Sequence, residues 1–201
     1  MRADGIKAGV LALQGAFREH REVLDALGVD STEVRIPEQL AGLDCLFLPG
    51  GESTTMGKLL RTSGLLEPIA ARVRDGLPTF GTCAGLILLA REVRDGRADQ
   101  PTFDALDIAL RRNAYGTQVA SFEAPLEIDG LVDAGLGADP FPGVFIRAPV
   151  VETVGPDVDV LSRYDGHPVL IRHARVWAST FHPELSGDLR IHQWFLREVT
   201  A

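Results

Sequence analysis

A cysteine flanked by glycines is the residue of this chain best suited to nucleophilic chemistry. Cys83 stands in Gly81-Thr82-Cys83-Ala84-Gly85, between one apolar segment and a second that begins at Leu86. This is the thiol counterpart of the G-x-S-x-G turn that carries the nucleophile of α/β hydrolases. Such a sharp strand-to-helix turn brings together the residues two before and two after the nucleophile, so both must be glycine.

The turn would also activate the sulfur. It places Cys83 near a helix N-terminus, where backbone N–H groups favour the thiolate. The N–H of Ala84 is then a natural donor to an oxyanion. The same pentapeptide equally fits a tight turn around a small buried thiol, so the catalytic interpretation requires a base.

The candidate base is His182, in Phe181-His182-Pro183-Glu184. Proline disfavours helical geometry in the residue before it, and in an extended segment residues two apart point the same way. The imidazole and the Glu184 carboxylate are therefore expected to meet. General-base assistance of this kind contributes roughly 10²–10⁴-fold to a rate. A surface His-Pro-Glu turn is the alternative interpretation.

The other four histidines have ordinary surroundings, and we expect each to face solvent or to be partly buried rather than catalytic. They are His20, His167, His173 and His192. His182 and Glu184 could supply two metal ligands, but no third ligand stands at suitable spacing. We expect no metal and no cofactor.

Composition restricts the possible partners and compartment. The chain has 201 residues, a net charge of −8 and 45% hydrophobic residues, as expected for one globular domain over residues 1–201. No basic cluster indicates binding to nucleic acid or to an anionic membrane. Two cysteines, Cys45 and Cys83, are too few for a disulfide framework, and Cys45 reads as an inert core residue. We expect a cytoplasmic protein.

The elements around Cys83 alternate between strand and helix. We expect strands at 6–13, 32–36, 45–48 and 78–81 and helices at 16–27, 53–61, 65–75 and 86–92. Short strands then dominate, at 106–110, 121–128, 144–146, 158–161, 169–173 and 176–181, before a helix at 188–199. The expected fold class is α/β: a central mixed, mostly parallel sheet flanked by helices, with extra antiparallel strands at one side.

Longer blocks connect the two motifs to a known family. They are Leu13-Gln14-Gly15-Ala16 with Arg18-Glu19-His20, Leu48 to Met56, Phe80 to Leu86, Arg112 to Gly116, Ser121-Phe122-Glu123, Gly143 to Pro149, and Ser179 to Leu185. In this order, across almost the whole chain, they resemble the class I glutamine amidotransferases, whose sheet is flavodoxin-like. Within that class they are most similar to the glutaminase subunits of pyridoxal 5′-phosphate synthase.

The resemblance implies an activity and a partner. The enzyme would hydrolyse L-glutamine to glutamate and ammonia through a cysteinyl thioester. The ammonia would pass to a (β/α)₈ barrel synthase subunit that makes pyridoxal 5′-phosphate (vitamin B6). In the family the glutaminase subunits surround a ring of twelve synthase subunits and are activated on docking.

The resemblance also implies site residues. Cys83, His182 and Glu184 match the catalytic triad. Six positions match the family's glutamine contacts: Gly51, Glu52, Ser53, Arg112, Ile146 and Arg147. Gly51 would add a second oxyanion donor beside Ala84, and arginine suits the α-carboxylate of glutamine. Without this resemblance, Arg112 and Arg147 would be interpreted as solvated surface residues.

The loop at Gln14-Gly15 would face the synthase subunit, since ligands collect at the carboxyl ends of parallel strands; an ordinary turn is the equal alternative. One segment departs from the family pattern. Residues 132–142 are longer and richer in glycine and aspartate, and we expect a surface loop there. A glutaminase subunit of another pathway, a stand-alone cysteine hydrolase and a catalytically silent regulatory subunit remain as competing functions.

Overall fold

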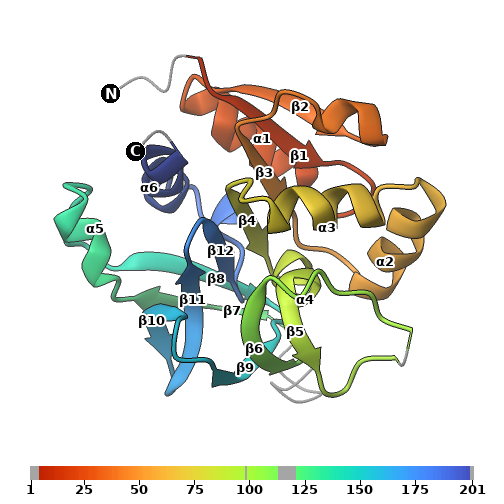
Figure 1. The fold of residues 1–201 in the computed structure, drawn as a ribbon. Coiled ribbons are helices and arrows are strands. Elements are labelled where there is room, and N and C mark those ends of the chain that lie inside the picture. The colour runs from red at the N-terminus through yellow and green to blue at the C-terminus, as the bar shows by residue number, and fades with distance from the viewer. Residues whose placement is uncertain (1–4, 98, 113–120, 200–201) are drawn as a thin grey trace.

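A parallel sheet forms the centre of the molecule. The computed structural model describes residues 5–97, 99–112 and 121–199 (Figure 1). The main sheet has seven strands in the order β10-β11-β12-β4-β3-β1-β2. Five are parallel: β1 (Lys7–Leu11), β2 (Asp30–Val34), β3 (Cys45–Leu48), β4 (Thr79–Thr82) and β12 (Val176–Ser179). β3, β4 and β12 are buried at every position, which explains why none of the three carries a charged side chain.

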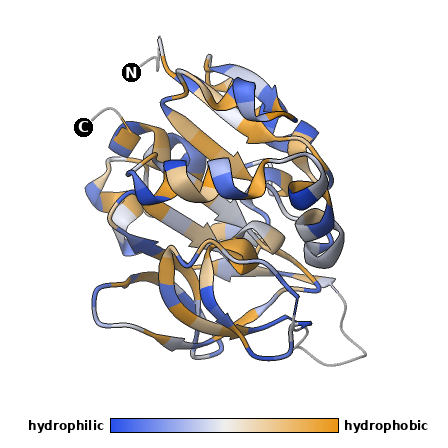
Figure 2. Cartoon of the chain, turned by 45° about the vertical axis from the view of Figure 1, so that its right-hand side comes forward, coloured by the Kyte–Doolittle hydropathy of each residue, from blue (hydrophilic) through white to orange (hydrophobic). Residues whose placement is uncertain are grey.

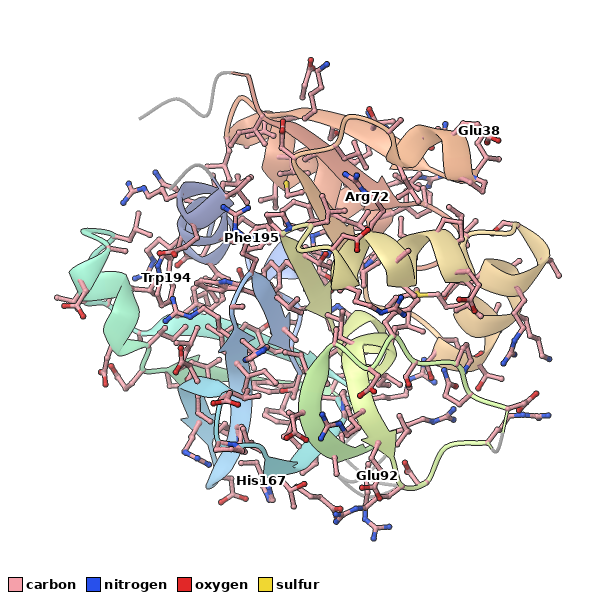
Figure 3. The ribbon with its side chains drawn as sticks, in the orientation of Figure 1. Glu38, Arg72, Glu92, His167, Trp194 and Phe195 are labelled. Atoms are coloured by element: carbon pink, nitrogen blue, oxygen red, sulfur yellow. The ribbon has the colours of Figure 1, made fainter. Side chains whose placement is uncertain are left out.

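Helices cover both faces of this sheet. Alternate residues of β3 point to opposite sides: Leu46 and Leu48 pack with α2 (Ser53–Thr62), α3 (Leu66–Arg74) and α4 (Ala84–Leu89). Cys45 and Phe47 pack with α1 (Phe17–Ala26) and α6 (Arg190–Val199). Hydrophobic colour accordingly gathers on the central strands in Figure 2, and Figure 3 shows Trp194 and Phe195 on α6 beside the sheet.

The expected antiparallel strands are present, but only some join the main sheet. β10 (Asp159–Tyr164) and β11 (His167–His173) extend it antiparallel beside β12. The others form two small sheets, β5-β6-β9 and β7-β8. Their strands are β5 (Ala90–Val93), β6 (Leu106–Arg111), β9 (Val150–Val154), β7 (Ser121–Leu126) and β8 (Phe141–Ile146).

Several predicted boundaries were wrong. The helix expected at 86–92 begins at Ala84 and ends at Leu89, and the chain continues as β5 because Ala90–Val93 pair with β6. β9 was missed. Short helices were also missed at η1 (Pro37–Leu40), η2 (Pro183–Leu185) and α5 (Asp129–Asp133). The surface loop expected at 132–142 is confirmed only for residues 134–140, which are exposed or half-buried. It begins inside α5, and Phe141 and Pro142 belong to β8, where Phe141 is fully buried.

The register of the parallel strands determines where their loops meet. Thr82, the last residue of β4, pairs with Ser179 at the end of β12, and Gly81 pairs with Leu48 at the end of β3. β1 runs parallel beside β3. The loops after all four strands therefore emerge at one edge. β2 lies on one side of β1 and β3 on the other, so the order of the strands reverses there, and ligand sites of α/β proteins form at such positions. No helix in the described part of the chain is long and apolar enough to span a membrane.

Candidate active site

Cys83 lies on a strained turn between β4 and α4. Its φ is 49° and its ψ is −99°, a backbone conformation that residues other than glycine rarely adopt. A Cβ atom at Gly85 would overlap the carbonyl oxygen of Leu48, and one at Gly81 would overlap the backbone of Gly85. The steric requirement for both glycines is thus met. Ala84 is the first residue of α4, so its N–H has no acceptor within the helix.

The neighbouring strand β12 leads into the segment that places the His182 imidazole near the Cys83 sulfur. The backbone N–H of Cys83 donates to the carbonyl oxygen of Ser179 at 2.8 Å, which joins the ends of β4 and β12. His182 follows three residues later, and its backbone N–H donates to Val144 of β8 at 2.8 Å. The side chains of His182 and Cys83 line the same cavity, and Cys83 is close enough to raise the pKa of His182. Two segments about a hundred residues apart in the chain are therefore in direct contact.

Glu184 approaches His182 by a different route from the one expected. Nδ1 of His182 lies 2.7 Å from Oε1 of Glu184, and the carboxylate is fully buried. Only His182 is near-extended (φ −107°, ψ 87°), because Pro183 opens the short 3₁₀ helix η2 that carries Glu184. The extended geometry predicted for the whole tripeptide was wrong, although the contact that it predicted is present.

The electrostatics of this pair favour the charged forms of both partners. Burial by itself would lower the pKa of His182, but hydrogen bonds and negative charge from Cys83 and Glu184 raise it overall. Burial would likewise raise the pKa of Glu184, but His20 and His182 beside it lower it overall. An imidazole with a raised pKa is suited to hold a proton as imidazolium.

A cavity of 430 Å³ opens beside Cys83. Its lining includes nearly every residue that the sequence implied: Gln14, Gly15, Gly51, Glu52, Ser53, Cys83, Arg112, Ile146, Arg147 and His182. Ala84 and Glu184 do not line the cavity, but Ala84 directly follows Cys83 and Glu184 hydrogen-bonds to His182. The lining is completed by four residues that were not among the predicted site residues: Ala16, Gly50, Ile87 and Leu185. Of the block at 112–116, residues 113–116 lie outside the described residues.

The Gln14-Gly15 loop packs against the loop after β3. Oε1 of Gln14 accepts a hydrogen bond from the backbone N–H of Glu52 at 2.9 Å, and the N–H of Ala16 donates to Gly50 at 3.0 Å. Gly15 has a φ of +92°, and a Cβ there would overlap the carbonyl oxygen of Gly50. This loop therefore buttresses the glycine-rich wall of the cavity.

The side chain of Glu52 serves its own helix. Its carboxylate accepts hydrogen bonds from the backbone N–H groups of Thr54 and Thr55 at 2.9 and 2.7 Å, which caps α2. Burial by itself would raise the pKa of Glu52, but the side-chain and backbone hydrogen bonds from Thr54 and Thr55 lower it to about 2. Glutamate is not among the usual N-cap residues, so the sequence did not indicate this cap. The backbone of Glu52 is engaged as well, since its N–H donates to Gln14 and its carbonyl oxygen accepts from Met56.

Two arginines lie on the wall of the cavity. Nη1 of Arg112 donates to Oγ1 of Thr54 at 3.0 Å and to Oε1 of Gln100 at 3.4 Å. Arg147 follows β8 with a φ of 45°, so the chain turns sharply at the cavity. Sγ of Cys83 lies 4.0 Å from the carbonyl oxygen of Ile146. Both arginines share the cavity with the thiol, which sequence position alone does not reveal.

The prediction for two histidines was wrong. His20 and His192 were expected to be exposed or partly buried, yet both are fully buried. His167 is exposed, as expected. His20 comes from α1 and His192 from α6, and both lie behind Glu184. Amphipathic spacing would have placed them on the inner faces of their helices.

A thiol, an imidazole and a carboxylate grouped at the carboxyl ends of parallel strands are the arrangement of thiol-dependent α/β hydrolases. The chain belongs to the SNO glutamine amidotransferase family, whose model matches residues 10–201.

Individual relatives agree over nearly the full length. A pyridoxal 5′-phosphate synthase subunit PdxT of Pelotomaculum thermopropionicum is 53% identical over 193 residues, which are 96% of this chain and 95% of the relative. One of Parafrankia sp. is 52% identical over 97% of this chain and 94% of the relative.

Solved structures show the same fold. A crystal structure of a glutamine amidotransferase superposes with a TM-score of 0.88 at 49% identity, covering 96% of this chain and 99% of that one. The structure of PurLQS from Thermotoga maritima gives 0.67 at 19% identity, over 96% of this chain and 98% of that one. At that low identity only the fold is shared.

Proposed function

We propose that this chain is a glutaminase subunit that releases ammonia from L-glutamine for the synthesis of pyridoxal 5′-phosphate. The observation that carries the proposal is the hydrogen bond between His182 and Glu184, with His182 and Cys83 on the wall of one cavity. The near-full-length relatives are subunits of that synthase, which supports the same pathway.

The chemistry follows from the geometry. The sulfur of Cys83 attacks the side-chain amide carbon of glutamine, and His182 holds the thiol proton. The C–N bond breaks, His182 delivers its proton to the leaving nitrogen, and ammonia departs from a thioester. Water, deprotonated by His182, then hydrolyses the thioester to glutamate and regenerates the thiol. Glu184 orients the imidazole and stabilises its charge throughout.

Backbone groups are suited to the oxyanion. The N–H of Ala84 is free of the helix, and Gly51 lies on the wall of the same cavity. We assign both as oxyanion donors. The α-carboxylate of glutamine is an appropriate ligand for Arg112 and Arg147, since guanidinium groups bind carboxylates with paired hydrogen bonds. Glu52, Ser53 and Ile146 complete the glutamine site through their positions on its wall.

The partner in this proposal is a (β/α)₈ barrel protein, in a complex of twelve copies of each chain. The Gln14-Gly15 loop would face that barrel. Because this loop holds the segment at 50–52 through Gln14 and Ala16, docking there would act directly on the oxyanion wall. We place the complex in the cytoplasm, with no metal or cofactor in the glutaminase subunit.

Ammonia release from glutamine, measured with and without the barrel subunit, tests the proposal. We expect little release from the chain alone, a marked increase with the partner, and none from Cys83→Ala. The matched control is Cys45→Ala, which alters the other cysteine outside the cavity lining and should remain active. In the Cys83→Ala complex, added ammonia should still support synthesis. Full glutaminase activity in Cys83→Ala would overturn the assignment.

A further inference from the structure

A chain of buried polar groups continues behind Glu184 into the core. Nε2 of His20 lies 3.6 Å from Oε2 of Glu184 and 3.2 Å from Oγ1 of Thr82. Nδ1 of His20 lies 3.1 Å from Nε2 of His192. The side chains of His20 and Glu184 have no exposed surface. The contact with His182 accounts for Oε1 of Glu184 only, so the purpose of this second group of contacts is open.

The surroundings of Thr82 determine which atoms carry hydrogen. Its Oγ1 accepts from the backbone N–H of Gly50 at 3.0 Å, and its hydroxyl donates to Oε1 of Glu184 at 3.3 Å. With that single proton committed to the carboxylate, Oγ1 can only accept from His20. Nε2 of His20 is therefore the protonated nitrogen. The same nitrogen lies beside the carboxylate oxygen Oε2.

The second histidine completes a consistent set of protons. If Nε2 of His20 carries the hydrogen, its Nδ1 accepts from the N–H of His192 Nε2. Of the four ring nitrogens of these two histidines, Nδ1 of His192 is then left as a bare lone pair, without a partner in the part of the chain that the structure describes. The opposite tautomers would place an unpaired N–H there and would turn a lone pair of His20 toward Glu184. Both changes are unfavourable.

The ring of His20 works as a neutral donor. Burial lowers its pKa, and the positive His182 lowers it further, while Glu184 and Glu19 act in the opposite direction. The groups that face it come from four elements: Glu19 of its own helix, Thr82 of β4, His192 of α6, and the pair of His182 and Glu184 around η2. A neutral N–H of His20 directed at the Glu184 carboxylate therefore adds no second buried charge.

We propose that His20 is a positioning residue for Glu184: its Nε2–H, shared between Oγ1 of Thr82 and Oε2 of Glu184, restrains Oε2, so that Oε1 remains directed at His182. Oε2 has no hydrogen-bond partner at ordinary length within the described residues, and His20 is the donor poised beside it. Hydrogen bonds of a catalytic site are often long before substrate binds. A shift of a few tenths of an ångström would bring Nε2 of His20 within hydrogen-bonding distance of Oε2 of Glu184. The inference rests on the proposed function, in which Glu184 orients the base.

The place of His20 in the fold gives the contact a further consequence. Its helix α1 begins at Phe17, directly after Ala16, which lines the cavity and binds Gly50. Thr82 binds the same loop through the N–H of Gly50. The carboxylate that orients the base and the glycine-rich wall of the cavity are therefore held by the same small set of groups.

Two substitutions separate positioning from packing. His20→Gln keeps an N–H close to the place of Nε2, whereas His20→Leu keeps most of the buried volume and removes the donor. In the complex with the barrel subunit, we expect His20→Leu to lower kcat about ten- to a hundredfold, by analogy with groups that orient metal ligands. KM for glutamine should stay within about twofold, because His20 does not line the cavity. His20→Gln should recover most of the loss.

The matched control is Phe47→Leu. Phe47 packs against the ring of His20 with centroids 5.5 Å apart and, as a hydrocarbon side chain, can make no hydrogen bond to Glu184, so this change costs stability without removing the donor. If kcat in all three variants merely follows the loss of thermal stability, or if His20→Gln is as slow as His20→Leu, the positioning role is wrong. If Cys83→Ala stays active, the proposed function itself fails, which is a separate outcome.

Discussion

Nδ1 of His182 and Oε1 of Glu184 lie 2.7 Å apart inside a site where the carboxylate has no exposed surface. Such a contact fixes which nitrogen of the imidazole faces the thiol. Because Glu184 also lies beside Thr82 and His20, its orientation depends on three separate elements of the fold. Loss of the Glu184 charge is therefore expected to impair the reactivity of the Cys83 sulfur.

Glu184→Gln should retain a base but lose its charge support. We expect kcat for glutamine hydrolysis in the complex to fall by about 10²–10⁴-fold, with KM nearly unchanged. His182→Ala should be slower still, since the proton carrier itself is removed. Steady-state ammonia release at saturating glutamine measures both. An unimpaired Glu184→Gln variant would contradict the role assigned to the carboxylate.

The two cysteines should differ sharply toward an alkylating agent. Burial, with Asp44 nearby, raises the pKa of Cys45 to about 12, which leaves on the order of 10⁻⁵ of it as thiolate at pH 7. Cys83 lines the cavity beside His182. Iodoacetamide at pH 7 should label Cys83 alone in the folded protein, as read by peptide mass spectrometry. In denaturant both should react; comparable labelling in the native state would refute the prediction.

Gly85 should not tolerate alanine. Its missing Cβ would overlap the backbone oxygen of Leu48, which cannot move as a side-chain tip can. Overpacking of this kind costs about 1–3 kcal/mol, and it would also displace the turn that holds Cys83. Chemical denaturation and ammonia release measure the two effects. Gly28→Ala is the comparison at an open glycine, where only the positive φ of 73° opposes the change; its stability should fall while its activity is kept.

Arg112 and its neighbour Arg111 offer a matched pair. Arg112 lines the cavity, whereas Arg111 is exposed and pairs with Glu152 at 2.6 Å. Loss of a hydrogen bond to a charged group costs about 1.5–3 kcal/mol, so Arg112→Gln should raise KM for glutamine about ten- to a hundredfold. Arg111→Gln should leave KM within about twofold. Equal effects from both variants would remove Arg112 from the glutamine site.

The cap on α2 predicts a dependence on pH. The pKa of Glu52 is about 2 in the folded protein against 4.5 as its ordinary value. A lowered pKa stabilises the fold above pH 4.5, and this contribution disappears as the pH falls toward 2. Glu52→Ala should cost about 1 kcal/mol at pH 7. The difference from wild type in urea denaturation should shrink below pH 4.5; a constant difference would show that the charge is irrelevant.

Local signals in the sequence were sufficient to predict the secondary-structure elements next to the candidate active site. The unbroken apolar run at Cys45–Leu48 and the glycine-flanked Cys83 predicted a buried strand and a strand-to-helix turn, and both are present. The His182–Glu184 contact also followed from the order of three adjacent residues. The strand and the turn were predicted correctly because they depend on sterics within a few residues, whereas the His182–Glu184 contact is made by the 3₁₀ helix η2 and not by the predicted extended segment.

Other features were decided only when distant segments packed together. Ala90–Val93 leaves its helix to pair with β6, and β9 forms only beside that same strand. His20 and His192 are buried because α1 and α6 cover one face of the sheet, next to a carboxylate that follows β12. By itself the sequence determined the reactive groups and their local turns. The tertiary structure decided which groups share one buried space, because strand pairing and core packing join residues about a hundred positions apart.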